Sequence, residues 1–150
     1  MSISKTCKLS KSVIIHHKDL VNLYGCKVGD DSRIGSFVEI QKNVSIGKQC
    51  KISSHTFICE GVTIEDKVFI GHGVMFINDT FSTGGPANGD VDLWKRTLIG
   101  NNVSIGSNST ILPVKICDNV IVGAGAVVTK DINQPGIYAG NPARILRELL

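Results

Sequence analysis

An apolar residue recurs every six positions through the first half of the chain. Nine successive steps are occupied by Val28, Ile34, Ile40, Ile46, Ile52, Ile58, Ile64, Ile70 and Phe76. A second side chain follows four residues after most of these, and it is nearly always small or β-branched. Apolar positions in a helix return every 3.6 residues, so a period of six excludes an amphipathic helix.

A six-residue step suits a short strand followed by a turn, with one apolar side chain pointing inward from each strand. Three such steps close a triangular coil. Coils stacked about 4.8 Å apart pair their backbones with one another and align like side chains in ladders. We therefore predict a single all-β domain over residues 1–150, built as a parallel β-helix.

The repeat is imperfect at its N-terminal end and is interrupted once. Residues 10–27 predict a degenerate first coil with Ile14, Leu20 and Cys26 inward. The register breaks after Phe81, where residues 82–92 are rich in turn-forming types and predict an inserted loop. The total is about six coils.

Beyond the loop the repeat resumes in a new phase. Its inward positions are Leu93, Ile99, Ile105, Ile111, Ile116, Val122 and Val128, with one step of five residues between Ile111 and Ile116. A helix over about 143–149 is expected after Pro142, because one face could carry Ile145, Leu146, Leu149 and Leu150. Such a helix would cover the open end of the β-helix.

Composition narrows the class of protein. The chain is 42% hydrophobic and has a net charge of only +3, which gives little support to nucleic-acid binding. No apolar run approaches the roughly 20 residues that span a bilayer. The five cysteines form no CxxC pair, which argues against a disulfide framework or a structural zinc site. We expect a cytoplasmic protein.

The tandem [Ile/Val]-Gly-x-x-small-x hexads resemble the hexapeptide-repeat acyltransferases. The resemblance implies a left-handed coil, because that family coils left-handed. The ending Gly123-Ala-Gly-Ala-Val-Val-Thr-Lys130-Asp, followed by Ala139-Gly-Asn-Pro-Ala-Arg144, resembles the C-terminal signature of the CoA-dependent branch. It implies acetyl-CoA as co-substrate and no metal. The implied cofactor-binding residues are Gly106, Ala124, Lys130, Pro142 and Arg144, with Lys130 and Arg144 at the CoA phosphates.

The stretch from Glu39 to Asp79, with Trp94 after the loop, resembles the 3-N-acetyltransferases of nucleotide-linked amino sugars. That resemblance implies acetylation of a dTDP-3-amino-3,6-dideoxyhexose, or of a UDP-linked 3-amino uronic acid, in O-antigen or S-layer glycan synthesis. Enzymes of this type are homotrimers with active sites between subunits. An O-acetyltransferase acting on a sugar hydroxyl is the alternative acceptor chemistry.

The polar residues before the loop are the candidates for catalysis. His72 is a candidate base, and Asn78 could orient the amine or the sugar. The candidate substrate-binding residues are Asp79, Glu60, His55, Gln41 and Trp94. Adding 18 moves one coil along a face, so Lys42, Glu60 and Asn78 share a column. We expect Glu60, His55, His72, Asn78 and Asp79 to gather at the base of the loop. Structural roles compete: His72 could bond to a neighbouring turn, and Asp79 could cap the loop as an Asx-turn.

Two other classes of protein use the same scaffold and are considered as alternatives. A γ-type carbonic anhydrase needs three histidines on a metal, but His16, His17, His55 and His72 include no HxxxxH pair. A non-catalytic β-helix used for assembly would have no affinity for CoA and no role for residues 82–92.

Overall fold

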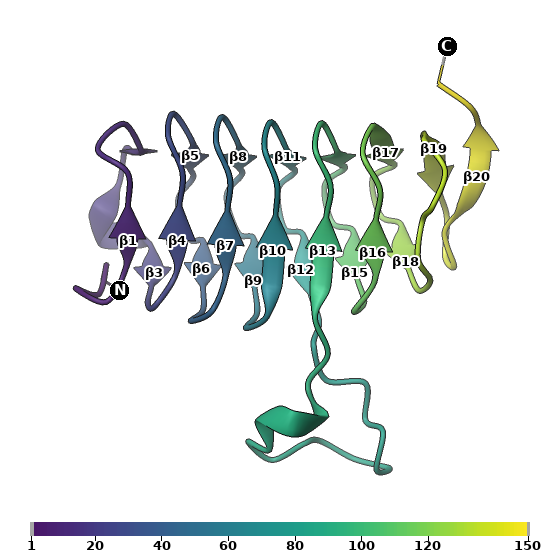
Figure 1. Ribbon diagram of the computed structural model, residues 1–150, viewed down its shortest axis with the longest axis horizontal. Helices are drawn as coiled ribbons and strands as arrows, with labels where there is room; N and C mark the ends of the chain where they lie inside the picture. The colour runs from purple at the N-terminus through teal and green to yellow at the C-terminus, as the bar shows by residue number, and fades with distance from the viewer. Residues whose placement is uncertain (1, 150) are drawn as a thin grey trace.

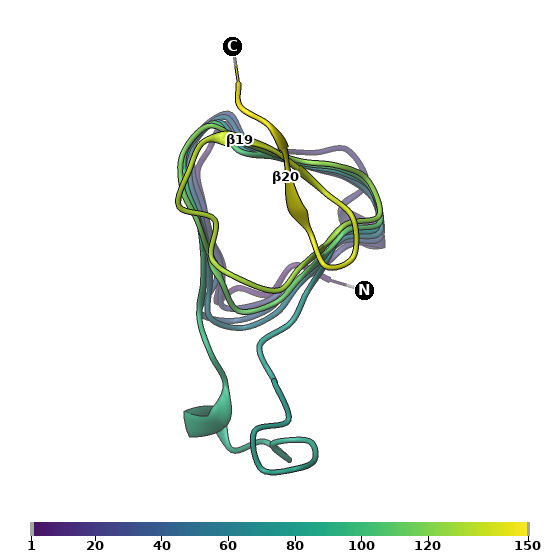
Figure 2. The same cartoon turned by 90° about the vertical axis from the view of Figure 1, so that its right-hand side faces the viewer.

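The chain folds into a β-helix of triangular cross-section, and the computed structural model describes residues 2–149 (Figure 2). In Figure 1 the chain rises along the front strands, crosses at the top to the rear and advances toward the right. This path is a left-handed coil. The all-β parallel β-helix predicted from the repeat is therefore confirmed, as is the left hand that the resemblance implied.

Three sheets form the sides of the prism, and up to β18 each takes every third strand, all of them parallel. Face 1 holds β1 (Lys8–Leu9), β4 (Lys27–Val28), β7 (Ser45–Ile46), β10 (Val62–Ile64), β13 (Thr97–Ile99) and β16 (Lys115–Ile116). Face 2 holds β2 (Ile14–Ile15), β5 (Arg33–Ile34), β8 (Lys51–Ile52), β11 (Phe69–Ile70), β14 (Ser104–Ile105), β17 (Val120–Val122), β19 (Gly136–Ala139) and β20 (Arg144–Arg147). Face 3 holds β3 (Asn22–Leu23), β6 (Glu39–Ile40), β9 (Phe57–Ile58), β12 (Met75–Phe76), β15 (Thr110–Ile111) and β18 (Val127–Val128). The stack makes about seven coils instead of the expected six, because the first coil begins at β1 and β19 adds to the end.

The core is a set of ladders of one inward side chain per strand. On face 2, Ile52 pairs with Ile70, and Ile70 pairs with Ile105 in the next coil. All three side chains are fully buried. Burying one such side chain stabilises the folded state by about 1.5–3 kcal/mol. The ladders therefore offset much of the conformational entropy that is lost when the backbone becomes ordered.

Each regular turn contains one residue in the left-handed backbone region. These residues recur every six positions at Gly25, Asp31, Phe37, Asn43, Gln49, His55, Gly61, Lys67 and Gly73. The turn Leu112-Pro113-Val114 has no such residue, which accounts for the five-residue step. Val114 still fills the corner, and Ile116 still pairs with Ile99, so the shortened turn leaves the register intact.

The first coil differs from the expected one in register. Ile14 is 37% exposed, whereas Ile15 and Leu23 point into the core and Leu20 is only partly buried. The helical turn η1 (Lys18–Leu20) adds residues at this corner, so eight positions separate Ile15 from Leu23. The assignment of Ile14 and Leu20 to the core was wrong for this reason, while Cys26 is buried as expected.

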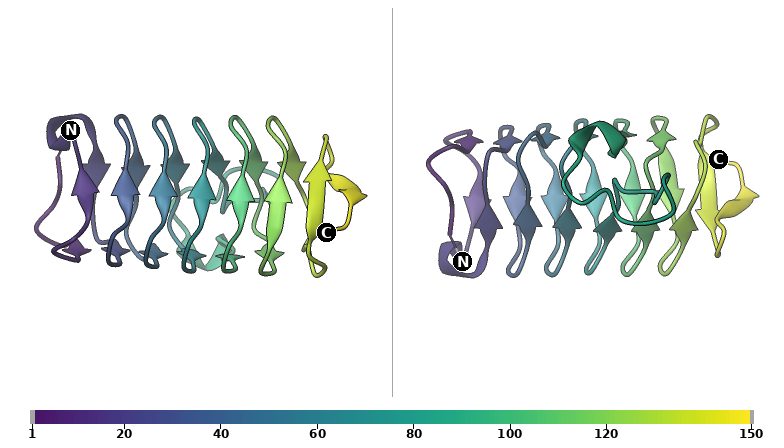
Figure 3. Two further views of the ribbon diagram at one scale, coloured as in Figure 1. Left: turned by 90° about the horizontal axis from the view of Figure 1, so that it is seen from above. Right: turned by 90° about the horizontal axis from the view of Figure 1, so that it is seen from below.

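The inserted loop is longer than residues 82–92. It leaves the coil between β12 and β13 and projects from the prism (Figure 1), while Ile77 and Asn78 remain hydrogen-bonded to the neighbouring coils. Seen from below, the loop lies beneath the middle coils (Figure 3). Leu93 belongs to the helical turn η2 (Val91–Leu93) within the loop, and it is not an inward ladder position. Phe81 is 60% exposed, so the regular block ends before it.

The C-terminal segment is a strand and not the expected helix. β20 pairs antiparallel with β19 and covers the last coil of face 2. A helix of so few residues is marginal by itself, whereas the free edge of β19 offers a row of unpaired backbone groups. Edge pairing therefore prevails over the helix propensity of the segment.

Candidate functional site

His72 lies on the corner that joins face 2 to face 3, which we name the His corner for His55 and His72. The turn Gly71-His72-Gly73 follows β11 and leaves the imidazole exposed. Its Nδ1 lies 2.9 Å from Oγ of Ser54, one coil earlier, and the His72 backbone N–H donates to Ser107 Oγ at 3.2 Å. When Nδ1–H donates to Ser54, the lone pair of Nε2 can accept a proton.

His55 occupies a different position on the same corner. It is the left-handed residue of its turn, with φ of 62°, and its ring packs against Phe37 with centroids 4.9 Å apart. The next left-handed position along this corner is Gly73, one residue beyond His72. His55 is thus an exposed member of a surface ladder, packed against Phe37.

Glu60 lies on the corner that joins face 3 to face 1, which we name the loop corner for Glu60 and Asn78. Its carboxylate accepts a hydrogen bond from Asn43 Nδ2 at 2.7 Å and lies 3.8 Å from Lys42 Nζ. The Asn78 side-chain amide donates to the Glu60 carbonyl at 3.1 Å, so Lys42, Glu60 and Asn78 form the expected column. The Glu60 side chain is 15% exposed, so most of it is buried at this corner.

Gln41 is fixed within the loop corner. Its Oε1 accepts the Glu60 backbone N–H at 3.1 Å, and its Nε2 donates to Glu39 Oε1 at 3.3 Å. Both ends of the amide are therefore engaged inside the ladder.

Asp79 holds the start of the loop. Its two carboxylate oxygens accept the backbone N–H groups of Phe81 at 2.9 Å and Ala87 at 2.7 Å. The two limbs of the loop meet at its neck, where the Lys95 backbone N–H donates to the Asn78 carbonyl at 2.9 Å. Asp79 makes the turn-capping contacts that a structural role requires.

The expected gathering of five residues at the base of the loop is wrong. His55 and His72 lie on the His corner, whereas Glu60, Asn78 and Asp79 lie on the loop corner, with face 3 between the two. The cause is the three-step coil: His72 and Asn78 are six residues apart, which carries the chain from one corner to the next.

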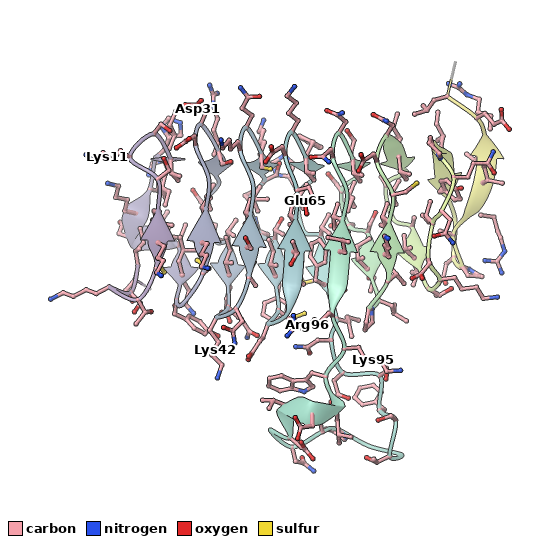
Figure 4. All side chains as sticks on the ribbon, in the orientation of Figure 1. Lys11, Asp31, Lys42, Glu65, Lys95 and Arg96 are labelled. Carbon is pink, nitrogen blue, oxygen red and sulfur yellow. The ribbon has the colours of Figure 1, made fainter. Side chains whose placement is uncertain are left out.

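A groove of about 510 Å³ lies between face 1 and the returning limb of the loop. Face 1 contributes Lys27, Ser45 and Thr63, which recur every 18 residues on adjacent strands. The remaining lining residues come from the loop corner and the loop, namely Gly25, Asn43, Val44, Glu60, Gly61, Val91, Asp92, Trp94, Lys95 and Arg96. In Figure 4, Arg96 lies at the neck of the loop, under β10. The lining is polar, and of the residues proposed from sequence it includes Glu60 and Trp94.

Sequence reasoning missed most residues of this groove. Lys27, Asn43 and Arg96 belong to no motif, but the 18-residue period places Lys27, Ser45 and Thr63 on one outward row. That spacing was the available signal.

A second groove, of about 360 Å³, lies at the C-terminal end. It brings Lys130 and Arg144 together with Tyr138 and Ile145. Pro142 is exposed in the turn that leads to β20. Two cations, Lys130 after β18 and Arg144 at the start of β20, thus line one shallow site together with the carboxylate of Asp131.

Ala124 and Gly106 lie on the His corner, beyond His72. Ala124 is exposed. A Cβ on Gly106 would lie 2.4 Å from the Ala124 backbone nitrogen, so the stacking of the coils itself requires glycine there.

The buried thiols of Cys50 and Cys59 are poor nucleophiles. Burial raises the pKa of Cys59 to about 12 and also raises that of Cys50. Within residues 2–149, no three His, Cys, Asp or Glu side chains are grouped to hold a metal ion. None of the helices described is long and apolar enough to cross a membrane.

Comparison with known proteins gives matches in both halves of the chain. Residues 25–60 match the bacterial transferase hexapeptide family model (six repeats), and residues 96–130 match the hexapeptide repeat of succinyl-transferase. Bifunctional protein GlmU of Clostridium botulinum is 32% identical over 123 residues, which are 81% of this chain and 24% of the relative. GlmU of Streptococcus uberis is 32% identical over 126 residues, covering 83% of this chain and 27% of the relative. The chain spans about a quarter of the length of these curated relatives.

Solved structures show the same fold. A hexapeptide transferase family protein from Anaplasma phagocytophilum superposes with a TM-score of 0.76 at 17% identity, over 96% of this chain and 80% of that one. A hexapeptide-repeat acetyltransferase from Vibrio cholerae, solved with acetyl coenzyme A, gives 0.61 at 24% identity, over 89% and 74%. With the repeat matched on both sides of the loop and the left-handed coil observed, the chain carries the hexapeptide repeat of bacterial transferases.

Proposed function

We propose that the protein is an acetyl-CoA-dependent N-acetyltransferase that acetylates the 3-amino group of a nucleotide-linked amino sugar in the cytoplasm. The observation that carries the proposal is the exposed His72, oriented by Ser54 on a hexapeptide-repeat scaffold. The acceptor we favour is a dTDP-3-amino-3,6-dideoxyhexose, used in O-antigen or S-layer glycan synthesis. A UDP-linked 3-amino uronic acid is the alternative nucleotide sugar.

Acetyl-CoA would lie along the His corner from the C-terminal groove. Lys130 and Arg144 supply positive charge for its phosphates. Ala124 is two coils beyond His72, which corresponds to roughly 10 Å at the usual strand spacing. The pantetheine arm can span that interval and bring the thioester to His72, past Gly106 and Ala124.

The acceptor would occupy the groove between face 1 and the loop. Trp94 offers an apolar ring to the base or the sugar, and Lys27 and Arg96 offer charge to the diphosphate. Glu60 and Asn78, stacked at the loop corner, would orient the amino sugar.

The reaction is attack of the neutral amine on the thioester carbonyl. The carbon–nitrogen bond forms, an oxyanion develops, and the carbon–sulfur bond breaks to release CoA thiolate. Positioning and oxyanion stabilisation dominate, since a neutral amine is already a competent nucleophile. Nε2 of His72 takes the proton lost from nitrogen.

A complete site would need a neighbouring copy of the chain. His72 and the groove lie on different corners of one prism, so a homotrimer would bring the His corner of one subunit to the loop of the next. A flat prism face is weakly concave, and an intersubunit cleft supplies the missing enclosure.

Mixing two impaired variants tests this sharing. We expect His72→Ala and Trp94→Ala chains, unfolded and refolded together in equal amounts, to recover activity, because about one quarter of randomly assembled sites would then contain both intact residues. Each variant refolded alone serves as control. No recovery in a mixed oligomer shown by mass spectrometry would place His72 and Trp94 of one site on one chain and contradict the proposal.

A thiol-release assay with acetyl-CoA and a panel of dTDP- and UDP-linked amino sugars tests the function itself. We expect release with a 3-amino sugar nucleotide, and a rise of roughly tenfold in the Kd of CoA for Lys130→Gln or Arg144→Gln, equivalent to about 1.4 kcal/mol each. Arg147→Gln, on the same strand as Arg144 but outside the groove, is the matched control. Release only with hydroxyl acceptors would replace the N-acetyltransferase by an O-acetyltransferase. Absence of CoA binding would leave a structural assembly module.

A further inference from the structure

Two cysteines meet where the first coil stacks on the second. Cys7 and Cys26 directly precede Lys8 and Lys27, which pair in register between β1 and β4. The Lys8 backbone N–H donates to the Cys26 carbonyl at 2.8 Å, so the two cysteines occupy adjacent rungs of one ladder. The Cys26 thiol donates to Cys7 Sγ at 3.7 Å. This pair plays no part in the proposed acetyl transfer.

We propose that Cys7 and Cys26 are a redox-active pair that a small disulfide such as glutathione disulfide converts to an intramolecular disulfide. Adjacent strands lie about 4.8 Å apart, which falls within the Cα separation of about 4.4–6.8 Å that disulfides use. The two sulfurs already face each other, so closure needs side-chain rotation without a change of register.

The two thiols differ in access, which sets their order of reaction. Cys7 is partly exposed, whereas Cys26 is fully buried. Burial and the neighbouring Cys7 raise the pKa of Cys26 to about 12, so Cys26 remains protonated while Cys7 is free. Cys7 is therefore the thiol that an external disulfide meets first.

Each step of the exchange balances. The Cys7 thiolate attacks one sulfur of glutathione disulfide, which breaks that bond, forms a mixed disulfide and releases one glutathione. Capping Cys7 removes its charge from beside Cys26. Cys26 then loses its proton to the departing thiolate and attacks Cys7 Sγ, which forms the Cys7–Cys26 bond and releases the second glutathione. Two protein thiols are oxidised, and one glutathione disulfide is reduced to two thiols.

The crosslink would secure the end of the β-helix. The first coil is irregular at η1, and its strands β1 and β2 are edge strands of their sheets within residues 2–149, so it has fewer strand contacts than the middle coils. Gly25 and Lys27, on either side of Cys26, line the groove between face 1 and the loop. The disulfide therefore anchors the first coil next to one wall of that groove.

The full chain, equilibrated in glutathione buffers of increasing oxidised fraction and then alkylated, provides the test. We expect peptide mapping to show one Cys7–Cys26 crosslink and the midpoint of thermal unfolding to rise by roughly 5 °C over the reduced protein. Cys7→Ser, at a partly exposed position, should abolish both effects. Cys117→Ser, which removes another partly buried thiol, should preserve them. Two results at the most oxidising glutathione ratio would overturn the proposal, provided that the protein is folded. In one, Cys7 is still a free thiol and is therefore alkylated; in the other, it remains a stable mixed disulfide with glutathione.

Discussion

Replacing His72 with alanine is expected to lower kcat by about 10²-fold with the KM for acetyl-CoA nearly unchanged. The imidazole is exposed and held at Nδ1 by Ser54, so its loss removes the proton acceptor without removing a core contact. Steady-state thiol release at saturating acetyl-CoA, measured across pH, is the readout.

Two neighbours on the His corner provide controls. His55→Ala removes an imidazole of the same type one coil earlier, where it packs on Phe37, and should change kcat by less than about threefold. Ser54→Ala leaves the base in place but releases its orientation, so we expect a loss of roughly tenfold in kcat and little change in KM. Equal losses for His55→Ala and His72→Ala would show that neither ring acts as the base.

The size of the His72→Ala effect also distinguishes the acceptors. A hydroxyl is a weak nucleophile that requires a base, so its acetylation should fall to background. An amine can pass its proton to the CoA thiolate or to buffer, so a measurable rate should remain and should rise with pH as more of the amine becomes neutral.

The repeat predicted the fold because each apolar residue from Val28 to Phe76 reports directly on one strand. The prediction failed in two places, where local interactions override the six-residue repeat. At the first coil, η1 inserts residues, so Ile15 is buried in place of Ile14. At the C-terminus, the segment that contains Ile145 favours a helix by composition, but the free edge of β19 binds it as a strand.

The candidate site was less predictable than the fold, although part of the signal was present. Counting by 18 correctly aligned Lys42, Glu60 and Asn78. The same count separates His72 from Asn78 by one corner, which the expectation of a single cluster overlooked. The loop obeys no period, so the bonds from Asp79 to Phe81 and Ala87 follow only from the folded path.

At Gly106, a role in coil packing can be tested directly against a role in CoA binding. The family resemblance implies that Gly106 binds CoA. However, a Cβ at this position would lie 2.4 Å from the Ala124 nitrogen and 2.8 Å from the Ala124 Cα. These are backbone atoms of the next coil, which cannot rotate away as a side chain can. Gly106→Ala must therefore push two coils apart or bend the turn.

We expect Gly106→Ala to lower the free energy of unfolding by about 1–3 kcal/mol, a decrease of roughly 5 °C in the unfolding midpoint, measured without CoA. Gly85→Ala is the matched control, because no atom lies within 4 Å of a Cβ there and its φ is not positive. Its stability should stay the same or rise slightly, since alanine restricts the unfolded chain. Unchanged stability of Gly106→Ala together with weaker CoA binding would assign Gly106 to the cofactor alone. Lost stability in the absence of CoA means instead that the stacking of the coils needs the glycine that follows Ile105. Any contact of Gly106 with CoA then uses a surface that coil packing already requires.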